Sequence, residues 1–207
     1  TLKSDFTFVL GRPKTGLYKF PAAEFTGKLQ IIDIGIPSNI DDEINLNLIT
    51  KKWAASLMPN RPLNSHKGTF GRALLVAGSS KYKGAAELAT AAAGRTGAGL
   101  VTLAIPASLS KTMGPLTTEA TLLPLSESRP GKLDKEAYLQ VIEEIRNYDS
   151  LLIGCGLGQA METQSFIENI LFSDTPLPPT ILDADSLNAI SKTSQWWKYL
   201  KTPSILT

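Results

Sequence analysis

Glycines and charged residues gather at a point where an apolar, strand-like run gives way to a helix-like stretch. The segment AGSSKYKGAA covers residues 77–86, in which Gly78 ends the run ALLVAG and Gly84 opens an alanine-rich stretch. Backbone N–H groups at the start of a helix attract anions, and Lys81 and Lys83 would add positive charge. The segment is a candidate phosphate-facing loop, although it lacks the GK[ST] ending of a P-loop. The alternative is that the glycines only make a tight turn.

A second glycine-rich segment, LLIGCGLG, covers residues 151–158. It reads GxGxG and not GxGxxG, because position 159 is Gln, and the next strand-ending acid, Asp183, lies too far along for a dinucleotide-binding Rossmann unit. A Rossmann oxidoreductase is therefore disfavoured. The glycines still predict a loop where backbone closely approaches a ligand. Cys155 is interpreted as a small filler, because no histidine–acid pair lies near it in sequence.

The third segment is ILDADSLNAI, residues 181–190. Asp183 and Asp185 close a predicted strand, and Asn188 falls in the first turn of the next predicted helix. Carboxylates at this end of a strand can hold Mg²⁺ through water or bind ribose and phosphate oxygens. We also expect Asp185 or Ser186 to cap the helix.

His66, the only histidine, and Lys67 lie in the segment NSHKGTFGR. They are candidates for supporting a pocket or binding an anion. The alternatives are a structural role for His66 and a solvated position for Lys67.

The segment MPNRPLNS, residues 58–65, is predicted to be a connector, and the chain after it alternates short apolar strands with helices. Strands are predicted at 73–78, 100–105, 120–125, 150–155, 180–185 and 204–207, and helices at 85–95, 133–147, about 162–171 and about 186–200. Continuous apolar strands are typical of a sheet covered on both faces. The pattern predicts a three-layer α/β fold with a mostly parallel sheet and right-handed crossovers.

The first 40 residues differ from the rest of the chain in their pattern of predicted strands and helices. They contain strand candidates at 6–10 and 29–36 but no helix-length pattern, and two strands cannot bury a core alone. From residue 41 onward, apolar residues at helical spacing predict a helix over about 44–57. We therefore expect a domain boundary between residues 40 and 41.

Composition excludes several classes of protein. The 207 residues carry a net charge of +2, with 43% hydrophobic and 19% charged residues, so neither nucleic acid nor a membrane is an expected partner. One cysteine excludes an intramolecular disulfide and indicates a reducing, cytoplasmic location. One Cys and one His argue against structural zinc. The chain has no initial Met and no signal peptide, and we expect it to be an internal piece of a longer protein.

The motifs, in their order along the chain, resemble a known enzyme family. HKGTFGRALLVAGS, KGAAELATAAAGRTGAGLV, GCGLG, LDADSLN and SILT are similar to the amino-terminal part of ADP/ATP-dependent NAD(P)H-hydrate dehydratases, which are ribokinase-like. Residues 6–37 resemble the closing strands of an NAD(P)H-hydrate epimerase domain. That order is found in bifunctional NAD(P)H-hydrate repair enzymes. The resemblance implies an epimerase-like end at 1–40 and an incomplete dehydratase domain at 41–207.

The resemblance implies repair of damaged nicotinamide nucleotides. In this family, ADP or ATP phosphorylates the hydroxyl of (S)-NADH hydrate or (S)-NADPH hydrate, and loss of phosphate restores the reduced nucleotide. Such phosphoryl transfer depends on positioning and charge stabilisation. Mg²⁺ is an implied cofactor, and K⁺ is implied for the epimerase domain, which interconverts the R and S hydrates. The full-length protein is expected to be a homo-oligomer.

The resemblance also implies site residues. Ala86 and Gly156 match positions that line the hydrate, and Gly84, Ala85 and Gly158 are expected beside them. Asp183, Asp185 and Asn188 match the segment next to the pocket. The family's catalytic Asp and nucleotide-binding loops would follow Thr207, so we expect no catalytic residue here and no activity of this chain alone. The alternatives are a ribokinase-like small-molecule kinase, in which the phosphate stays on the product, and a non-enzymatic nucleotide-binding module.

Overall fold

The computed structural model describes residues 2–207 and divides into two compact units, Thr1–Arg61 and Pro62–Thr207. The division lies 21 residues beyond the boundary expected between residues 40 and 41, so the connecting segment is grouped with the first unit. One reason is an ion pair between Arg12 and Asp41, which ties the start of that segment to the loop after the first strand.

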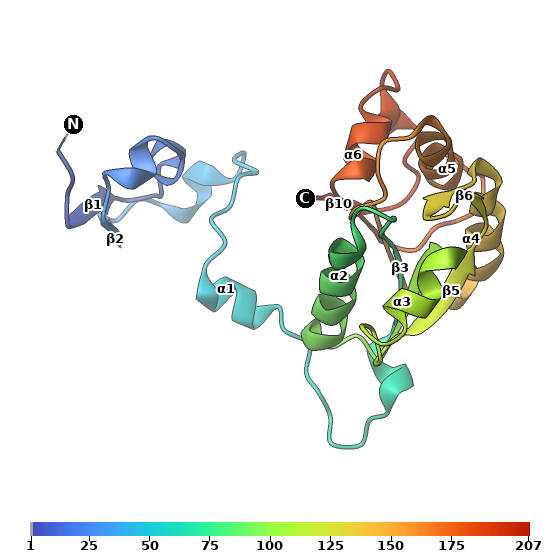
Figure 1. Cartoon of the computed structure of the whole chain (residues 1–207). Coiled ribbons are helices and arrows are strands. Elements are labelled where there is room, and N and C mark those ends of the chain that lie inside the picture. Colours follow the sequence, from blue (N-terminus) through green and yellow to red (C-terminus); the bar gives the residue numbers. More distant parts are fainter. Residues whose placement is uncertain (1) are drawn as a thin grey trace. The chain divides into compact units, whose positions relative to one another are not determined.

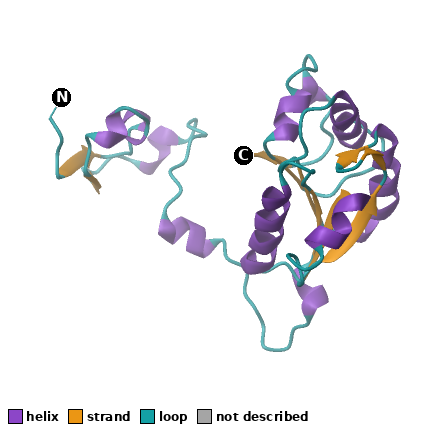
Figure 2. Ribbon diagram, in the orientation of Figure 1, coloured by secondary structure: helices purple, strands orange, loops and turns teal. Residues whose placement is uncertain are grey.

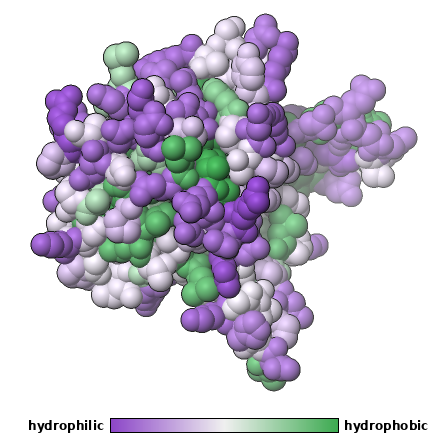
Figure 3. All heavy atoms as spheres, turned by 90° about the vertical axis from the view of Figure 1, so that its right-hand side faces the viewer, coloured by the Kyte–Doolittle hydropathy of each residue, from purple (hydrophilic) through white to green (hydrophobic). Residues whose placement is uncertain are grey.

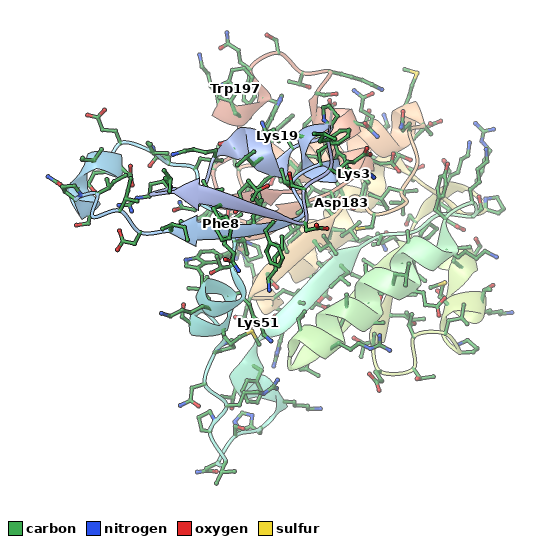
Figure 4. All side chains as sticks on the ribbon, turned by 90° about the vertical axis from the view of Figure 1, so that its left-hand side faces the viewer. Lys3, Phe8, Lys19, Lys51, Asp183 and Trp197 are labelled. Carbon is green, nitrogen blue, oxygen red and sulfur yellow. The ribbon has the colours of Figure 1, made fainter. Side chains whose placement is uncertain are left out.

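The first unit is built on two parallel strands, β1 (Phe6–Leu10) and β2 (Lys28–Ile32), joined by a connection with two short 3₁₀ helices. The predicted second strand was too long. It stops where the side chain of Asp33 accepts a hydrogen bond from the Gly35 N–H, a local turn that removes the chain from the pairing. Few side chains of this unit are buried. Within residues 2–61, Val9 is the one buried hydrophobic residue, whereas Phe8 on β1 is exposed (Figure 4).

The helix expected over 44–57 is largely absent. Only α1 (Lys51–Ser56) forms, with the Thr50 hydroxyl accepting a hydrogen bond from the Trp53 N–H at 3.1 Å. Short helices are marginal unless an apolar face packs against something. The apolar residues of the predicted face are all exposed: Ile44, Leu48, Ile49, Trp53 and Leu57.

The second unit contains a six-stranded sheet in the order β10-β9-β8-β3-β4-β5, in which every neighbouring pair is parallel. The strands are β3 (Arg72–Val76), β4 (Leu100–Pro106), β5 (Thr121–Leu125), β8 (Ser150–Ile153), β9 (Thr180–Leu182) and β10 (Ser204–Leu206). The predicted parallel α/β sheet is confirmed. Strand β9 is shorter than expected, because Ala184 takes a positive φ of 47° and turns the chain.

Helices cover both faces of this sheet, so the fold has three layers (Figures 1 and 2). Leu74 and Val76 face one side, where they join the apolar core under α4 (Tyr138–Glu144), α5 (Met161–Leu171) and α6 (Asp185–Ile190). Ala73 and Leu75 face the other side, with residues of α2 (Lys83–Thr96) and α3 (Ser110–Met113). This alternation follows from the two-residue period of a strand.

Two predicted helices are shorter in the structure. The helix expected over 133–147 begins after Leu133, which belongs to an antiparallel hairpin of β6 (Glu127–Arg129) and β7 (Lys132–Leu133) that the sequence analysis missed. The helix expected over 186–200 ends at Ile190, and a separate 3₁₀ turn spans Trp196–Lys198. Just after Ile190, the Ser191 hydroxyl donates to the Asn188 carbonyl, a local side-chain bond of the kind that competes with a continuing helix. The Thr193 hydroxyl donates to a carboxylate oxygen of Glu168 on α5.

The surface is of mixed polarity, and the helices are short. The face drawn in Figure 3 mixes hydrophilic residues with separate hydrophobic patches. Across residues 2–207, none of the helices has the length and apolar character needed to cross a membrane.

We predict that L74A destabilises the second unit, because Leu74 is fully buried at the centre of the sheet. The free energy of unfolding should fall by about 2–5 kcal/mol, measured by urea denaturation with circular dichroism. L88A is the matched control, since Leu88 is 72% exposed on α2, and it should change stability by less than about 0.5 kcal/mol. Equal effects of the two substitutions would contradict this assignment of the core.

Candidate functional site

A cavity of about 620 Å³ opens at the carboxyl ends of β3, β8 and β9. Ligands of open α/β sheets bind at the carboxyl ends of the strands, and the volume of this cavity lies within the range usual for small-molecule sites. Its walls come from the loops after these three strands and from the β6–β7 hairpin. The lining residues are Ser79, Ser80, Lys81, Tyr82, Ala85, Gly131, Lys132, Gly156, Leu157, Gly158, Gln159, Ala160, Thr163, Ala184 and Asp185.

The first wall is the loop between β3 and α2. The Gly78 N–H donates to the Cys155 carbonyl at 2.8 Å, and the Ser79 hydroxyl donates to the Gly156 carbonyl at 2.8 Å. These two bonds fix the loop after β3 against the loop after β8. Gly78 has a φ of +83°, and a Cβ there would lie 2.8 Å from the Cβ of Ala86, so glycine is required.

Three residues of this loop that were predicted to contact substrate lie at different places relative to the cavity. Ala85 lines the cavity. Ala86 is fully buried beneath Gly78 and supports the wall from behind. Gly84 lies near the start of α2 outside the lining, and no atom lies within 4 Å of its Cβ position.

The second wall is the glycine loop after β8. A Cβ at Gly156, where φ is +67°, would lie 2.7 Å from the Tyr82 Cβ, so glycine allows the two loops to approach. Gly158 differs, because it also has a positive φ but no atom lies within 4 Å of its Cβ position. Gly158 therefore leaves open space on the cavity side, and its N–H donates to an Asp185 carboxylate oxygen at 2.7 Å.

Asp185 forms the third wall, at the start of α6. Its other carboxylate oxygen accepts a hydrogen bond from the Asn188 side-chain amide at 3.2 Å. The predicted capping role is wrong for both Asp185 and Ser186. The residue before α6 is Ala184, no side chain caps the helix, and the Ser186 hydroxyl donates to the Asp183 carbonyl instead.

Asp183 does not line this cavity. One of its carboxylate oxygens accepts a hydrogen bond from the Cys155 thiol at 3.1 Å and the other from the Thr207 hydroxyl at 3.1 Å. All three residues line a separate cavity of about 400 Å³, formed mainly by apolar residues on the α2 side of the sheet. Figure 4 labels Asp183 in the loop that follows β9.

His66 and Lys67 lie at the amino ends of the strands, on the side of the sheet away from the cavity. They begin a 3₁₀ helix that runs directly into β3, at the amino end of the strand. The His66 Nδ1 accepts a hydrogen bond from the Gly68 N–H at 3.1 Å, and the Thr69 hydroxyl accepts one from the His66 N–H at 3.3 Å. These bonds favour the structural interpretation of His66.

The donors present do not make a protein-held metal site. Among residues 2–207, no group of three His, Cys, Asp or Glu side chains could hold a metal ion. Asp183 and Asp185 line different cavities, and the carboxylate of each already accepts two hydrogen bonds. Mg²⁺ usually binds through one or two carboxylates together with substrate phosphates. The described residues therefore do not hold a metal ion by themselves, and a Mg²⁺ ion here would need oxygen ligands from a bound phosphate group.

Cys155 is held as a thiol. Its burial raises the pKa to about 12, and the hydrogen bond to Asp183 and the negative charge of that residue act in the same direction. Since the thiolate is the nucleophilic form, Cys155 is unreactive near neutral pH. This supports the interpretation of the residue as a filler.

The hairpin wall and its cavity residues, Gly131 and Lys132, were not predicted from the sequence. A signal was available, because the segment SRPGK contains a Pro-Gly pair typical of a turn. Gly131 takes a φ of +76°, and a Cβ there would lie 2.4 Å from the Ser80 Cβ. The hairpin thus contacts the β3–α2 loop directly.

Comparison with known proteins places this geometry in context. A family model described as NAD(P)H-hydrate dehydratase matches residues 73–207. The bifunctional NAD(P)H-hydrate repair enzyme Nnr of Moorella thermoacetica is 36% identical over 192 residues, which make up 92% of this chain and 36% of that protein. The chain therefore spans little more than a third of the length of this relative.

Solved structures with the same fold give a similar result. The ADP/ATP-dependent NAD(P)H-hydrate dehydratase of Bacillus subtilis, crystallised with ATP and Mg²⁺, is 29% identical with a TM-score of 0.58, covering 79% of this chain and 52% of that one. A ribokinase-like superfamily protein of Enterococcus faecalis has 24% identity and a TM-score of 0.58, covering 72% and 50% of the two chains. The similarity to the Enterococcus faecalis protein shows a shared fold and nothing more.

We predict slow alkylation of Cys155, because its pKa of about 12 leaves almost no thiolate at pH 8. Iodoacetamide should react about 100-fold or more slowly than with free cysteine. D183N removes a charge that raises this pKa, so alkylation should become faster. D185N, which alters a carboxylate that does not contact Cys155, is the control. A wild-type rate equal to that of free cysteine would refute the assignment.

Proposed function

Since the chain belongs to the NAD(P)H-hydrate dehydratase family, we propose that it contributes the hydrate-binding half of a nicotinamide-nucleotide repair enzyme. The whole protein would restore NADH or NADPH from the (S)-hydrates, with ADP or ATP as phosphoryl donor and Mg²⁺ bound with its phosphates. The observation that carries the proposal is the cavity of about 620 Å³, whose walls all lie within the matched region.

The cavity suits recognition of an extended polar substrate. Two of its walls are backbone loops locked to each other by Gly78–Cys155 and Ser79–Gly156 hydrogen bonds. A locked wall loses little entropy when a ligand binds, and catalysis of phosphoryl transfer depends mainly on such positioning. We assign Ala85, Gly156 and Gly158 to direct substrate contact, and Ala86 to support of the wall from behind.

Asp185 is the carboxylate we assign to a substrate hydroxyl. It lines the cavity, and the bonds from Gly158 and Asn188 fix its orientation. No group in the described part of the chain is assigned as the catalytic base. Cys155 is not assigned as a nucleophile, because its burial raises the pKa of its thiol.

The first unit is proposed to come from an epimerase domain that interconverts R and S hydrates, with K⁺ as its cofactor. The support is that the alignment with the Moorella thermoacetica repair enzyme covers 92% of this chain and so extends well into the first unit. Cytoplasmic location and homo-oligomerisation of the whole protein are part of the same proposal.

A small-molecule kinase of the ribokinase-like class is the second candidate, because the fold by itself does not determine what happens to the transferred phosphate. The two reactions differ in the fate of the phosphate. A dehydratase releases orthophosphate and generates the absorbance of NADH or NADPH, whereas a kinase leaves a stable phosphoester.

The proposal is tested with protein expressed from its complete reading frame. Incubated with (S)-NADPH hydrate, ADP or ATP and Mg²⁺, it should release orthophosphate and form NADPH in equal amounts. A phosphorylated product that keeps its phosphate would support the kinase, and absence of any turnover of the hydrate would overturn the proposal.

We predict that D185N in the same protein raises KM for the hydrate about tenfold, because a neutral amide accepts a weaker hydrogen bond from a substrate hydroxyl than a carboxylate does. The measurement is initial rate against hydrate concentration at saturating ADP. E119Q, a change at an exposed carboxylate outside the cavity, is the control. An unchanged KM for D185N would remove Asp185 from the substrate site.

A further inference from the structure

We propose that Lys81 and Lys132 together bind the diphosphate group of the dinucleotide hydrate, and that Glu127 positions the hairpin that carries Lys132. The inference rests on the proposed function and extends it to the charged part of the substrate. Lys132 lies outside the motifs that carry the family resemblance, and Lys81 lies between two of them, in the candidate phosphate-facing loop.

The two lysines reach one cavity from different parts of the chain. Lys81 lies in the loop after β3, and Lys132 lies on β7 of the hairpin. The carbonyl of Gly131 accepts a hydrogen bond from the Ser80 N–H at 3.1 Å, so the neighbours of the two lysines are directly bonded. This bond brings the backbone of the β3–α2 loop and that of the hairpin together beside the cavity that both lysines line.

Glu127 fixes the hairpin in place. One of its carboxylate oxygens accepts hydrogen bonds from the Gly131 N–H at 2.6 Å and the Ser108 hydroxyl at 2.7 Å. The other accepts from the Ser108 N–H at 3.2 Å. Ser108 lies just after β4, so the Glu127 carboxylate joins the turn of the hairpin to the loop at the carboxyl end of β4. In the described part of the chain, this carboxylate forms no ion pair with Lys81 or Lys132.

The lysines have no other assigned partner. Within residues 2–207, no carboxylate lies within 4.0 Å of either ammonium group, whereas Lys135 and Lys201 both form ion pairs. Two exposed cations side by side repel each other, and an anion between them removes that repulsion. A diphosphate offers charged oxygens to both.

Charge is distributed unevenly along the cavity, and this orients the ligand. The sheet order places β9 with Asp185 on one side of β8, and β3 with Lys81 on the other. Two strand spacings separate those ends by about 10 Å. A ligand with an anionic group near the lysines and a hydroxyl near Asp185 matches both ends, whereas the reverse orientation places like charges together.

The experiment compares K81Q/K132Q with wild type in protein expressed from its complete reading frame. KM for (S)-NADPH hydrate should rise about tenfold or more, while KM for ADP stays within about twofold, since charge-assisted hydrogen bonds to the substrate are lost. K111Q/K135Q removes the same charge at exposed positions outside the cavity and is the control. An unchanged KM for the hydrate, or a change in KM for ADP alone, would overturn the proposal.

The role of Glu127 has its own readout. If it acts by positioning Lys132, E127A should raise KM for the hydrate in the wild-type background but add little in the K132Q background. Equal effects in both backgrounds would show that Glu127 acts independently of Lys132. Urea denaturation of each variant separates these effects from loss of folded protein.

Binding of NADPH itself separates failure of this proposal from failure of the proposed function. Fluorescence titration with NADPH needs no turnover of the hydrate. Wild-type protein that binds NADPH through the two lysines but shows no dehydration would retain the diphosphate site and lose the proposed activity. Protein that dehydrates the hydrate equally well with and without the lysines would retain the activity and lose the diphosphate site.

Discussion

The pairing of β3 with β8 is the constraint on which the site depends. These strands lie 77 residues apart in sequence but are neighbours in the sheet, with Leu75 opposite Leu152. Their loops continue the pairing beyond the strands through the Gly78–Cys155 and Ser79–Gly156 hydrogen bonds. The two loops lie close together, and Gly78 and Gly156 allow this spacing because a Cβ at either position would lie less than 3 Å from an atom of the β3–α2 segment.

This constraint also explains why two similar aspartates have different environments. Asp183 and Asp185 are separated by Ala184, whose positive φ turns the chain sharply after β9. Asp183 is directed to Cys155 and Thr207 on the α2 side, where burial first and then this carboxylate raise the pKa of the thiol. Asp185 reaches the cavity between the loops. One turn thus assigns one carboxylate to structure and the other to the candidate site.

The hairpin completes the cavity without belonging to the sheet. Its position depends on Glu127, whose carboxylate collects donors from Ser108 and Gly131, and on the contact between Gly131 and Ser80. These polar bonds place a lysine beside the loop after β3, and they give the cavity a basic end opposite its acidic end. Charge separation of this kind favours a polar ligand in one orientation.

The sequence by itself determined the parallel α/β sheet and the glycine-rich loops that follow β3 and β8, because apolar periodicity and the need for positive φ are local properties. It did not determine the length of α1 or α6, since short helices depend on packing and on competing side-chain bonds. Only the tertiary structure decided that Asp185 lies in the cavity while Asp183, His66 and Lys67 do not. Which strand lies beside which, and which edge a loop occupies, are set by long-range pairing that no local pattern encodes.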